Sequence, residues 1–193
     1  MVPTDQLELI ELSGRHVPGA LHLSEEAKWN QVKADWRMML KAGTVFGFEA
    51  EGRLIASALT LPFGDRCGWV SMVLVTAKWQ KQGLATRLLK ACIERLESNG
   101  LVPVLDATPD GENVYRPLGF VPHFGLQRWF HEAPEEINLA KTELEAPEAI
   151  KVHRIDQEVF GGERPAVLES LLGRSVEFAC HSPDGNGFLL GRD

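Results

Sequence analysis

The sequence predicts an α/β fold in which helices flank a central sheet, and three observations lead to this prediction. Strand-length apolar segments alternate with segments of helical periodicity. A glycine-containing turn joins two of the strands as a hairpin, and a nearly continuous apolar run leads through a second glycine turn into a long amphipathic helix. With 193 residues and 44% hydrophobic composition, the chain can bury one full core, so we expect one domain plus an appendage.

The first elements are a strand and two helical segments. Residues 6–12 alternate around apolar side chains and predict a strand that ends at Ser13 and Gly14. Ser24 is placed to cap a helical turn that runs to Trp29. Asp35 is placed to start a second helix, which we expect to end at Gly43.

The middle of the chain predicts a hairpin, a buried strand and a helix. Residues 44–49 and 54–61 flank a turn at residues 50–53, and residues 63–66 form the next turn. Residues 69–75 are nearly all apolar, which is typical of a central strand covered on both faces. From Gly83 onward, apolar residues recur at helical spacing until Asn99 and Gly100 end the helix. These residues are Leu84, Leu88, Leu89, Cys92, Ile93 and Leu96.

The segments that follow predict the last strands of the sheet. Residues 101–105 are apolar enough for a strand, although Pro103 cannot donate a hydrogen bond to a neighbour and would be awkward in the middle of a sheet. Residues 123–131 are rich in aromatic and apolar side chains and could complete the sheet. Residues 132–148 become acidic and contain two prolines, which is typical of a linker.

Charge, cysteine spacing and hydropathy limit the partners. The formal net charge of -7 argues against a nucleic-acid surface and favours cationic or neutral partners. No long uncharged apolar stretch or amino-terminal leader pattern is present, so we expect a cytoplasmic protein without membrane contact. The three cysteines and six histidines lack the spacing of disulfides or metal sites, so we expect free thiols and no metal.

The turn at residues 80–86, Gln-Lys-Gln-Gly-Leu-Ala-Thr, has the layout of an anion-binding site. Backbone N–H groups at a helix start have no intrahelical partner and carry the positive end of the helix dipole. Neither the Gly-x-x-x-x-Gly-Lys-Ser/Thr loop nor, at this junction, Gly-x-Gly-x-x-Gly is present. Nucleotide triphosphate hydrolysis and dinucleotide binding are therefore disfavoured.

Two motifs resemble the GNAT superfamily of acetyl-CoA-dependent N-acetyltransferases. Gln80, Gly83 and Ala85 fill the defining positions of its pyrophosphate loop, Gln/Arg-x-x-Gly-x-Gly/Ala. Further on, Tyr115-Arg116-Pro117-Leu118-Gly119-Phe120 is similar to the family segment Tyr-x-x-Leu-Gly-Phe. The resemblance covers roughly residues 5 to 130. Without it, the two motifs would be a tight turn before a core helix and a loop tyrosine that packs under Pro117.

The resemblance implies an α+β three-layer fold, with a mixed, mostly antiparallel central sheet flanked by helices. The two helices after the first strand would help to form the acceptor cleft. The strand after the pyrophosphate helix would splay from the strand before it, leaving a V-shaped opening for the pantetheine arm. Pro103 would lie where that pairing has lapsed, with a plain strand end as the alternative.

The tail predicts a partial second copy of the domain. Residues 150–155, a helix from Glu163 with Pro165 in its first turn, and strands near Val176 and Phe188 repeat the early part of the chain. Residues 156–164 also resemble the opening of the second domain in tandem GNAT proteins. We therefore expect a GNAT-like domain over residues 1–133, a linker over 134–148, and a small C-terminal α/β partial repeat over 149–193. The alternative is an ordinary C-terminal extension.

The resemblance also implies which residues bind and react. Backbone N–H groups of Met72, Val73, Leu74 and Val75 would hold the acetyl carbonyl and pantetheine, and the loop would hold the diphosphate. The loop set is Gln80, Lys81, Gln82, Gly83, Leu84, Ala85, Thr86 and Arg87, with Lys81 and Arg87 as cations and Lys78 and Lys90 as weaker contributors. Tyr115 would be the general acid, because a phenol stays protonated at neutral pH and can donate to a thiolate. Asp106 is a candidate base, with a turn-forming role as its alternative, and Glu49 and Glu51 are expected to be surface charges.

The resemblance implies a transferase that moves the acetyl group of acetyl-CoA to a primary amine, by direct attack in a ternary complex. The acceptor is a small molecule or a peptide amine. The alternative is a catalytically silent coenzyme A-binding sensor or interaction module. A homodimer through the C-terminal segment is compatible with either function.

Overall fold

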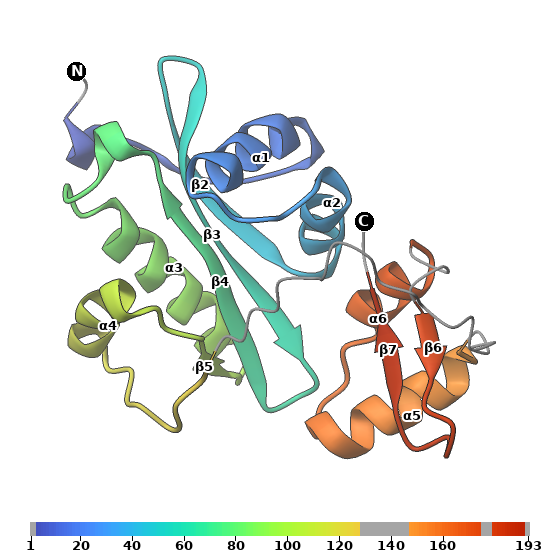
Figure 1. The fold of residues 1–193 in the computed structure, drawn as a ribbon. Helices are drawn as coiled ribbons and strands as arrows, with labels where there is room; N and C mark the ends of the chain where they lie inside the picture. The colour runs from blue at the N-terminus through green and yellow to red at the C-terminus, as the bar shows by residue number, and fades with distance from the viewer. Residues whose placement is uncertain (1–2, 128–146, 175–178, 192–193) are drawn as a thin grey trace.

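The fold is a three-layer α+β domain followed by a small helical and hairpin unit. It is seen in a computed structural model, which describes residues 3–127, 147–174 and 179–191 (Figure 1). Five strands form the central sheet in the order β1-β2-β3-β4-β5. They span Leu9–Glu11, Thr44–Ala50, Arg53–Phe63, Cys67–Val75 and Val102–Val104. All neighbours are antiparallel except β4 and β5, so the mixed, mostly antiparallel sheet is confirmed.

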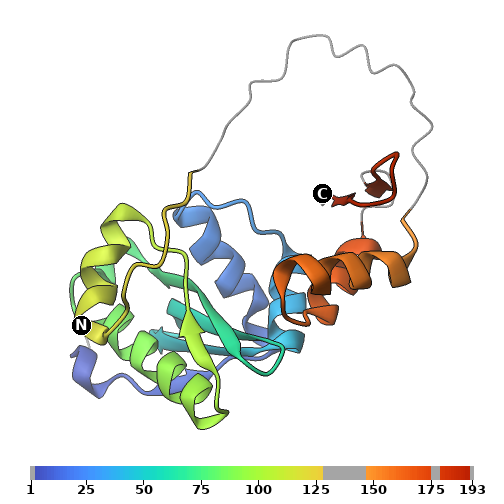
Figure 2. The ribbon, with the colours of Figure 1, turned by 90° about the horizontal axis from the view of Figure 1, so that it is seen from below.

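Helices cover both faces of the sheet because the strands alternate their side chains between two cores. On one face, α1 (Val17–Glu26) and α2 (Lys33–Ala42) bury Leu23 and Trp36 against β2, β3 and β4. On the other face, α3 (Leu84–Ser98) packs one apolar side against β3 and β4. The short helix α4 (Pro109–Tyr115) lies on the same side as α3 (Figure 2). Four single 3-10 turns complete this part: η1 (Thr4–Gln6), η2 (Gly14–His16), η3 (Ala77–Trp79) and η4 (Arg116–Leu118).

Most predicted elements are confirmed, and the helix stops have identifiable causes. The α2 helix ends at Gly43, where a Cβ atom would lie 1.9 Å from the carbonyl oxygen of Thr60, so close backbone approach requires glycine there. Asp35 caps the start of α2 by accepting a hydrogen bond from the backbone N–H of Val32 at 2.9 Å. The first strand is shorter than predicted, because residues 4–6 form η1.

Ser24 does not cap a helical turn as predicted. It lies inside α1, where its buried hydroxyl donates to the carbonyl oxygen of Ala20 and accepts from the indole N–H of Trp36 at 3.0 Å. The hydroxyl therefore joins α1 to α2, a contact between residues too distant in sequence for local capping rules to find.

Pro103 lies within the paired part of β5, opposite Gly68, and not where pairing has lapsed. The backbone N–H of Val102 donates to Arg66 across the strand pair at 2.9 Å, so the nitrogen of the next residue faces away from β4. A missing donor on that outer side removes no ladder hydrogen bond.

The expected closing strand at residues 123–131 is wrong for its described part, since residues 121–127 form no regular element. The remainder of that segment, and most of the predicted linker at 134–148, lie outside the described residues. The expected domain boundaries stay a prediction.

The C-terminal unit holds two helices and a hairpin: α5 (Ala149–Phe160), α6 (Pro165–Leu172), β6 (Ala179–His181) and β7 (Phe188–Leu190). The helix after Glu163 and the strand near Phe188 are confirmed. Residues 150–155 lie in α5, whereas the early part of the chain has the strand β1, and the predicted partial repeat stays a prediction. The apolar residues of α5 lie at helical spacing, with Val152 buried and Ile150 exposed. Val176 lies outside the described residues.

Candidate active site

The strands β4 and β5 separate at one end, and this separation creates an opening in the sheet. Their parallel pairing runs from Cys67 opposite Val102 to Trp69 opposite Val104, where β5 ends. The β4 strand continues to Val75, and along residues 70–75 it has no partner on that side among the described parts of the chain. Backbone groups of β4 are therefore directed into the opening, as the resemblance predicts for a pantetheine site.

A β-bulge lies in β4 at the opening. Ser57 of β3 pairs with Leu74 and Leu59 pairs with Ser71, so two residues of β4 lie opposite one residue of β3. Met72 takes a positive φ of 51°, which non-glycine residues rarely adopt. The hydroxyl of Ser57 donates to the carbonyl oxygen of Met72 at 3.0 Å and stabilises this conformation. The bulge sets the direction of the backbone groups of Met72 and Val73.

The turn after β4 ends at the amino terminus of α3, as predicted. Gly83 is the residue before the helix and has φ 83°, a left-handed conformation that favours glycine. Lys81 also has a positive φ of 59°. The first backbone hydrogen bond of the helix runs from Arg87 N to Gly83 O, so the N–H groups of Leu84, Ala85 and Thr86 precede the hydrogen-bonded ladder. This arrangement suits an anion.

Side chains from the loop and from α1 hold the turn in place. The amide of Gln80 donates to Val75 O at 3.0 Å, and the amide of Gln82 donates to Lys78 O at 3.1 Å. The carboxylate of Glu26, at the end of α1, accepts from Ala77 N at 2.7 Å and from the Thr76 hydroxyl at 2.9 Å. These bonds, led by the one from Ala77, lower the pKa of Glu26. Sequence reasoning missed Glu26, because the carboxylate lies 50 residues away from Thr76.

Two residues that the sequence singled out have partners that were not predicted. The guanidinium of Arg87 donates to the carbonyl oxygens of Thr4 and Leu7 and lies over the ring of Phe48, so its charge is directed at the amino-terminal segment. Asp106 accepts a hydrogen bond from the indole N–H of Trp69 at 3.1 Å. That bond links the two strands where they separate.

Tyr115 is the last residue of α4 and, like Val73 and Val75, packs against the core cluster that contains Leu84. Its ring lies 6.1 Å from that of Phe120, in an edge-to-face arrangement. Burial raises the pKa of the phenol above its ordinary value of 10.0. The hydroxyl therefore keeps its proton at neutral pH.

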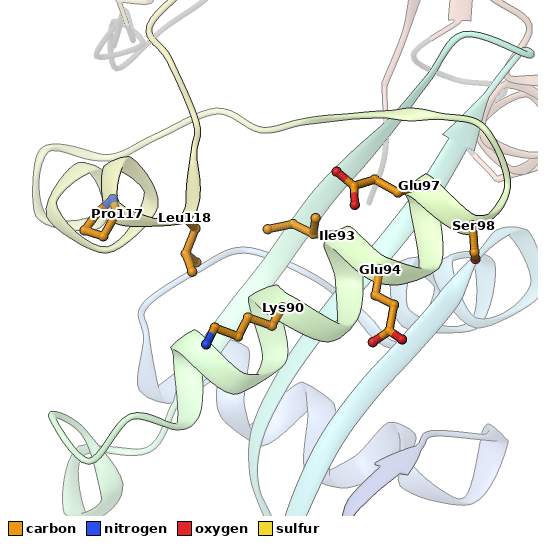
Figure 3. Close-up of a pocket in the computed structure, with 7 residues that line it drawn as sticks. All are labelled: Lys90, Ile93, Glu94, Glu97, Ser98, Pro117 and Leu118. Carbon is orange, nitrogen blue, oxygen red and sulfur yellow. The ribbon is translucent and has the colours of Figure 1, made fainter.

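A cavity of about 600 Å³ lies beside α3 and η4 (Figure 3). Its lining residues are Lys90, Ile93, Glu94, Glu97, Ser98, Pro117 and Leu118. The carboxylates of Glu94 and Glu97 outnumber the single ammonium group of Lys90, so this cavity does not suit a phosphate. Lys90 therefore lies beside acidic side chains and not in the loop that was predicted to bind the diphosphate.

A second cavity, of about 680 Å³, lies between the start of α1, the β2–β3 hairpin and η3. Glu49 and Glu51 line it, together with Lys78. The buried ring of His16 lies there, with Nε2 3.6 Å from the carboxylate of Glu49. Glu49 is thus a partner of a buried histidine as well as a surface charge.

Within the described ranges, no three or more His, Cys, Asp or Glu side chains gather as a metal ion would require. The helices in those ranges are all too short or too polar to cross a lipid bilayer.

Residues 14–120 match the Acetyltransferase (GNAT) family, so more than half of the chain carries the family pattern. The chain belongs to this family. It is 26% identical over 175 residues to the uncharacterized N-acetyltransferase YitH of Bacillus subtilis, covering 88% of this chain and 62% of that protein. The chain thus spans less than two thirds of that relative.

Solved structures share the fold. A Pyrococcus horikoshii protein assigned as an acetyltransferase superposes with a TM-score of 0.65 at 16% identity, over 90% of this chain and 63% of that one. An acetyltransferase of Trypanosoma brucei gives 0.57 at 22% identity, over 65% of this chain and all of that one. Glucosamine-6-phosphate N-acetyltransferase of Arabidopsis thaliana gives 0.55 at 12% identity, over 65% and 99%. At these identities the likeness concerns the fold alone.

Proposed function

We propose that the protein is an N-acetyltransferase that transfers the acetyl group of acetyl-CoA to a primary amine by direct attack in a ternary complex. The observation that carries this proposal is the order of three features in space: the opened edge of β4, the turn with Gly83 in a left-handed conformation, and the amino terminus of α3. Membership of the GNAT family and the relation to an N-acetyltransferase of Bacillus subtilis support it.

The coenzyme is held mainly by backbone groups. Its diphosphate lies over the N–H groups of residues 82–86, and the pantetheine arm follows residues 72–75 along the open edge of β4. Lys81 supplies the nearby positive charge. Arg87 is not part of the proposed diphosphate site, because its backbone N–H donates to Gly83 O and its guanidinium is bonded to Thr4 and Leu7. Main-chain binding leaves the apolar side chains of Val73 and Val75 free to pack in the core.

The proposed reaction proceeds through amine attack, departure of the thiolate and loss of a proton. A neutral amine attacks the thioester carbonyl, a C–N bond forms, and the carbonyl oxygen gains negative charge that backbone N–H groups near the β4 bulge stabilise. The C–S bond then breaks, and Tyr115 donates its proton to the departing thiolate. Burial keeps the phenol protonated, which suits this role. The proton that the attacking nitrogen carries after C–N bond formation leaves to solvent.

The decisive experiment compares two glycines at opposite ends of α3. Gly83 and Gly100 have φ values of 83° and 72°, and a Cβ atom at either would meet nothing within 4 Å. Gly83→Glu and Gly100→Glu therefore carry a similar backbone strain of about 1–2 kcal/mol and the same added charge. Only Gly83→Glu places that charge at the proposed diphosphate.

The measurement is thermal unfolding with and without acetyl-CoA. At about 100 times the dissociation constant, the ligand stabilises by ~2.7 kcal/mol, which raises Tm by roughly 5–10 °C in a chain of this size. We expect this shift in the parent and in Gly100→Glu, and its loss in Gly83→Glu. No shift in the parent would refute coenzyme binding. Binding without turnover on a panel of amines would instead indicate a coenzyme A-binding module.

A further inference from the structure

The C-terminal helices pack onto the first domain at the β3–β4 turn and along α2 (Figures 1 and 2). The backbone N–H of Gly64, in the β3–β4 turn, donates to Glu163 O at 2.8 Å. The guanidinium of Arg174, just after α6, lies 2.8 Å from the carboxylate of Asp35 in α2. Both side chains of that pair are mostly buried. The contact joins α5 and α6 to the face of the sheet that α1 and α2 cover.

Phe160, at the end of α5, reaches the strand that forms the active-site opening. Its ring centroid lies 5.8 Å from that of Trp69 in β4 and 5.6 Å from that of Phe63 in β3. The guanidinium of Arg164 stacks on the Phe160 ring, with its Cζ atom 4.1 Å from the ring centroid. The buried carboxylate of Asp156 accepts from that guanidinium through both oxygens, at 2.6 to 3.2 Å. The phenyl ring is therefore fixed in orientation, and the charge of Arg164 is balanced locally.

Trp69 is the last residue of β4 that pairs with β5, where it lies opposite Val104. Its indole N–H donates to Asp106, which lies two residues beyond Val104. The carboxylate of Asp106 is exposed, and Trp69 is half-buried. An aromatic side chain and a carboxylate at one point of an opening are the two groups that attract a cation most directly, through the ring face and through charge. Trp69, to which Asp106 is bonded, packs on the α1 and α2 side of the sheet, whereas Tyr115 packs on the α3 side.

We propose that the α5–α6 unit forms one wall of the acceptor side of the opening, and that the acceptor is a primary amine with a second cationic group. The second cation binds Asp106 and Trp69, and Phe160 positions the Trp69 ring from the C-terminal unit. This inference rests on the proposed acetyl transfer and specifies its acceptor. Asp106 then acts in recognition and not in proton removal.

The probes are putrescine and n-butylamine, which have the same carbon chain and differ by one ammonium group. With acetyl-CoA saturating, we expect kcat/KM for putrescine to exceed that for n-butylamine by at least tenfold, and the ratio to fall as salt screens the charge. Asp106→Asn should bring the ratio close to one, while the thermal shift by acetyl-CoA stays as in the parent.

The role of the α5–α6 unit as a wall of the acceptor site is tested by Phe160→Ala, with Val159→Ala at the neighbouring residue for comparison. Val159 is 82% exposed on the same helix, so its truncation is a matched control. Phe160→Ala should raise KM for putrescine at least fivefold with little change in KM for acetyl-CoA, and Val159→Ala should change neither. Phe160→Leu, which keeps an apolar side chain of similar bulk, guards against misfolding as the cause and should give an intermediate KM.

Equal kcat/KM for the two amines, or a putrescine preference that survives Asp106→Asn, would overturn the cation site. An unchanged putrescine KM in Phe160→Ala would overturn the wall. Failure to acetylate either amine would also overturn the inference, since a site for a second cation should accept the simplest diamine. In that case a retained acetyl-CoA shift would leave the proposed function standing, whereas its absence in the parent would refute both.

Discussion

The two ends of the candidate site are built in different ways. At the proposed coenzyme end, the binding groups would be backbone N–H groups in one continuous segment, from the β4 bulge through Gly83 to the first turn of α3. At the acceptor end, Trp69 and Asp106 lie 37 residues apart, and Phe160 comes from beyond the described first domain. Backbone binding depends on local conformation, which short motifs encode. Side-chain binding depends on packing between distant segments, so it can diverge while the coenzyme end stays the same.

The largest effect that distinguishes the acceptor end from the coenzyme end should be the loss of stability caused by Arg174→Ala. Removing the guanidinium leaves the mostly buried carboxylate of Asp35 without this partner, which we expect to cost about 3 kcal/mol of stability and to release α6 from α2. Urea unfolding measures the loss, and Arg154→Ala, an exposed position on α5, is the control. If the two ends are independent, acetyl-CoA should still bind; loss of binding in folded protein would break the comparison.

The next effect concerns chemistry and not binding. Tyr115→Phe should lower kcat by about 100-fold, since positioned acid catalysis typically contributes 10²–10⁴, while the acetyl-CoA thermal shift stays within error. Because burial raises the pKa of the phenol above 10.0, kcat should not fall with pH until beyond that value in the parent. A pH–rate profile checks this. An unchanged rate in the variant would remove Tyr115 from the mechanism.

A smaller effect should follow from Gly68→Ala, at the contact between α3 and the paired part of β4. The new Cβ would lie 2.2 Å from Cδ2 of Leu96, so the helix or the leucine must move. We expect a loss of roughly 1–2 kcal/mol by urea unfolding. The double variant Gly68→Ala/Leu96→Ala should be more stable than Leu96→Ala alone, because the new methyl group occupies space that the leucine has left. If the losses of the two single variants simply add in the double variant, the two positions do not compete for space.

The smallest effect should come from Glu26→Gln, which tests the link between α1 and the coenzyme turn. The folded-state pKa of Glu26 is lowered, chiefly by the Ala77 N–H, so the carboxylate stabilises the fold above its unfolded pKa of about 4.5. This stabilisation is lost as pH falls through the folded value. For an exposed group we expect a difference of a few tenths of a kcal/mol at pH 7, which shrinks as the pH falls below 4.5. Glu25→Gln is the matched control, and equal behaviour of both variants would contradict the role of Glu26.

The strand, turn and helix of the proposed coenzyme end could be predicted because their signals are local. Residues 69–75 are nearly all apolar, and Leu84, Leu88 and Cys92 repeat at helical spacing. Glycine is the residue type that fits the left-handed turn at position 83 at no steric cost. The hairpin of β2 and β3 was predictable for the same reason. The β4 bulge left a weak signal in the sequence, since Ser57 interrupts the apolar run of residues 54–59 in β3 and its hydroxyl bonds Met72 O.

The remainder depended on contacts that no window of sequence contains. The guanidinium of Arg87 binds an amino-terminal segment about 80 residues away, and Ser24 binds Trp36 across two helices. Residues 150–155 were expected to repeat the early part of the chain, and they lie in α5; short apolar runs do not distinguish a strand from a helix. The aromatic contact that joins Phe160 to Trp69 is of the same long-range kind. The expected homodimer through the C-terminal segment stays a prediction.

The burial of Cys92 has a practical consequence for measuring turnover. Cys92 lies on the buried side of α3, in the core cluster, and burial raises the pKa of its thiol to about 12. Almost no thiolate therefore exists at neutral pH. Released coenzyme A can therefore be followed with a chromogenic thiol reagent without a steady background from this residue. Cys67 and Cys180 are partly accessible, and replacing them with serine would leave a protein whose colour change reports the reaction alone.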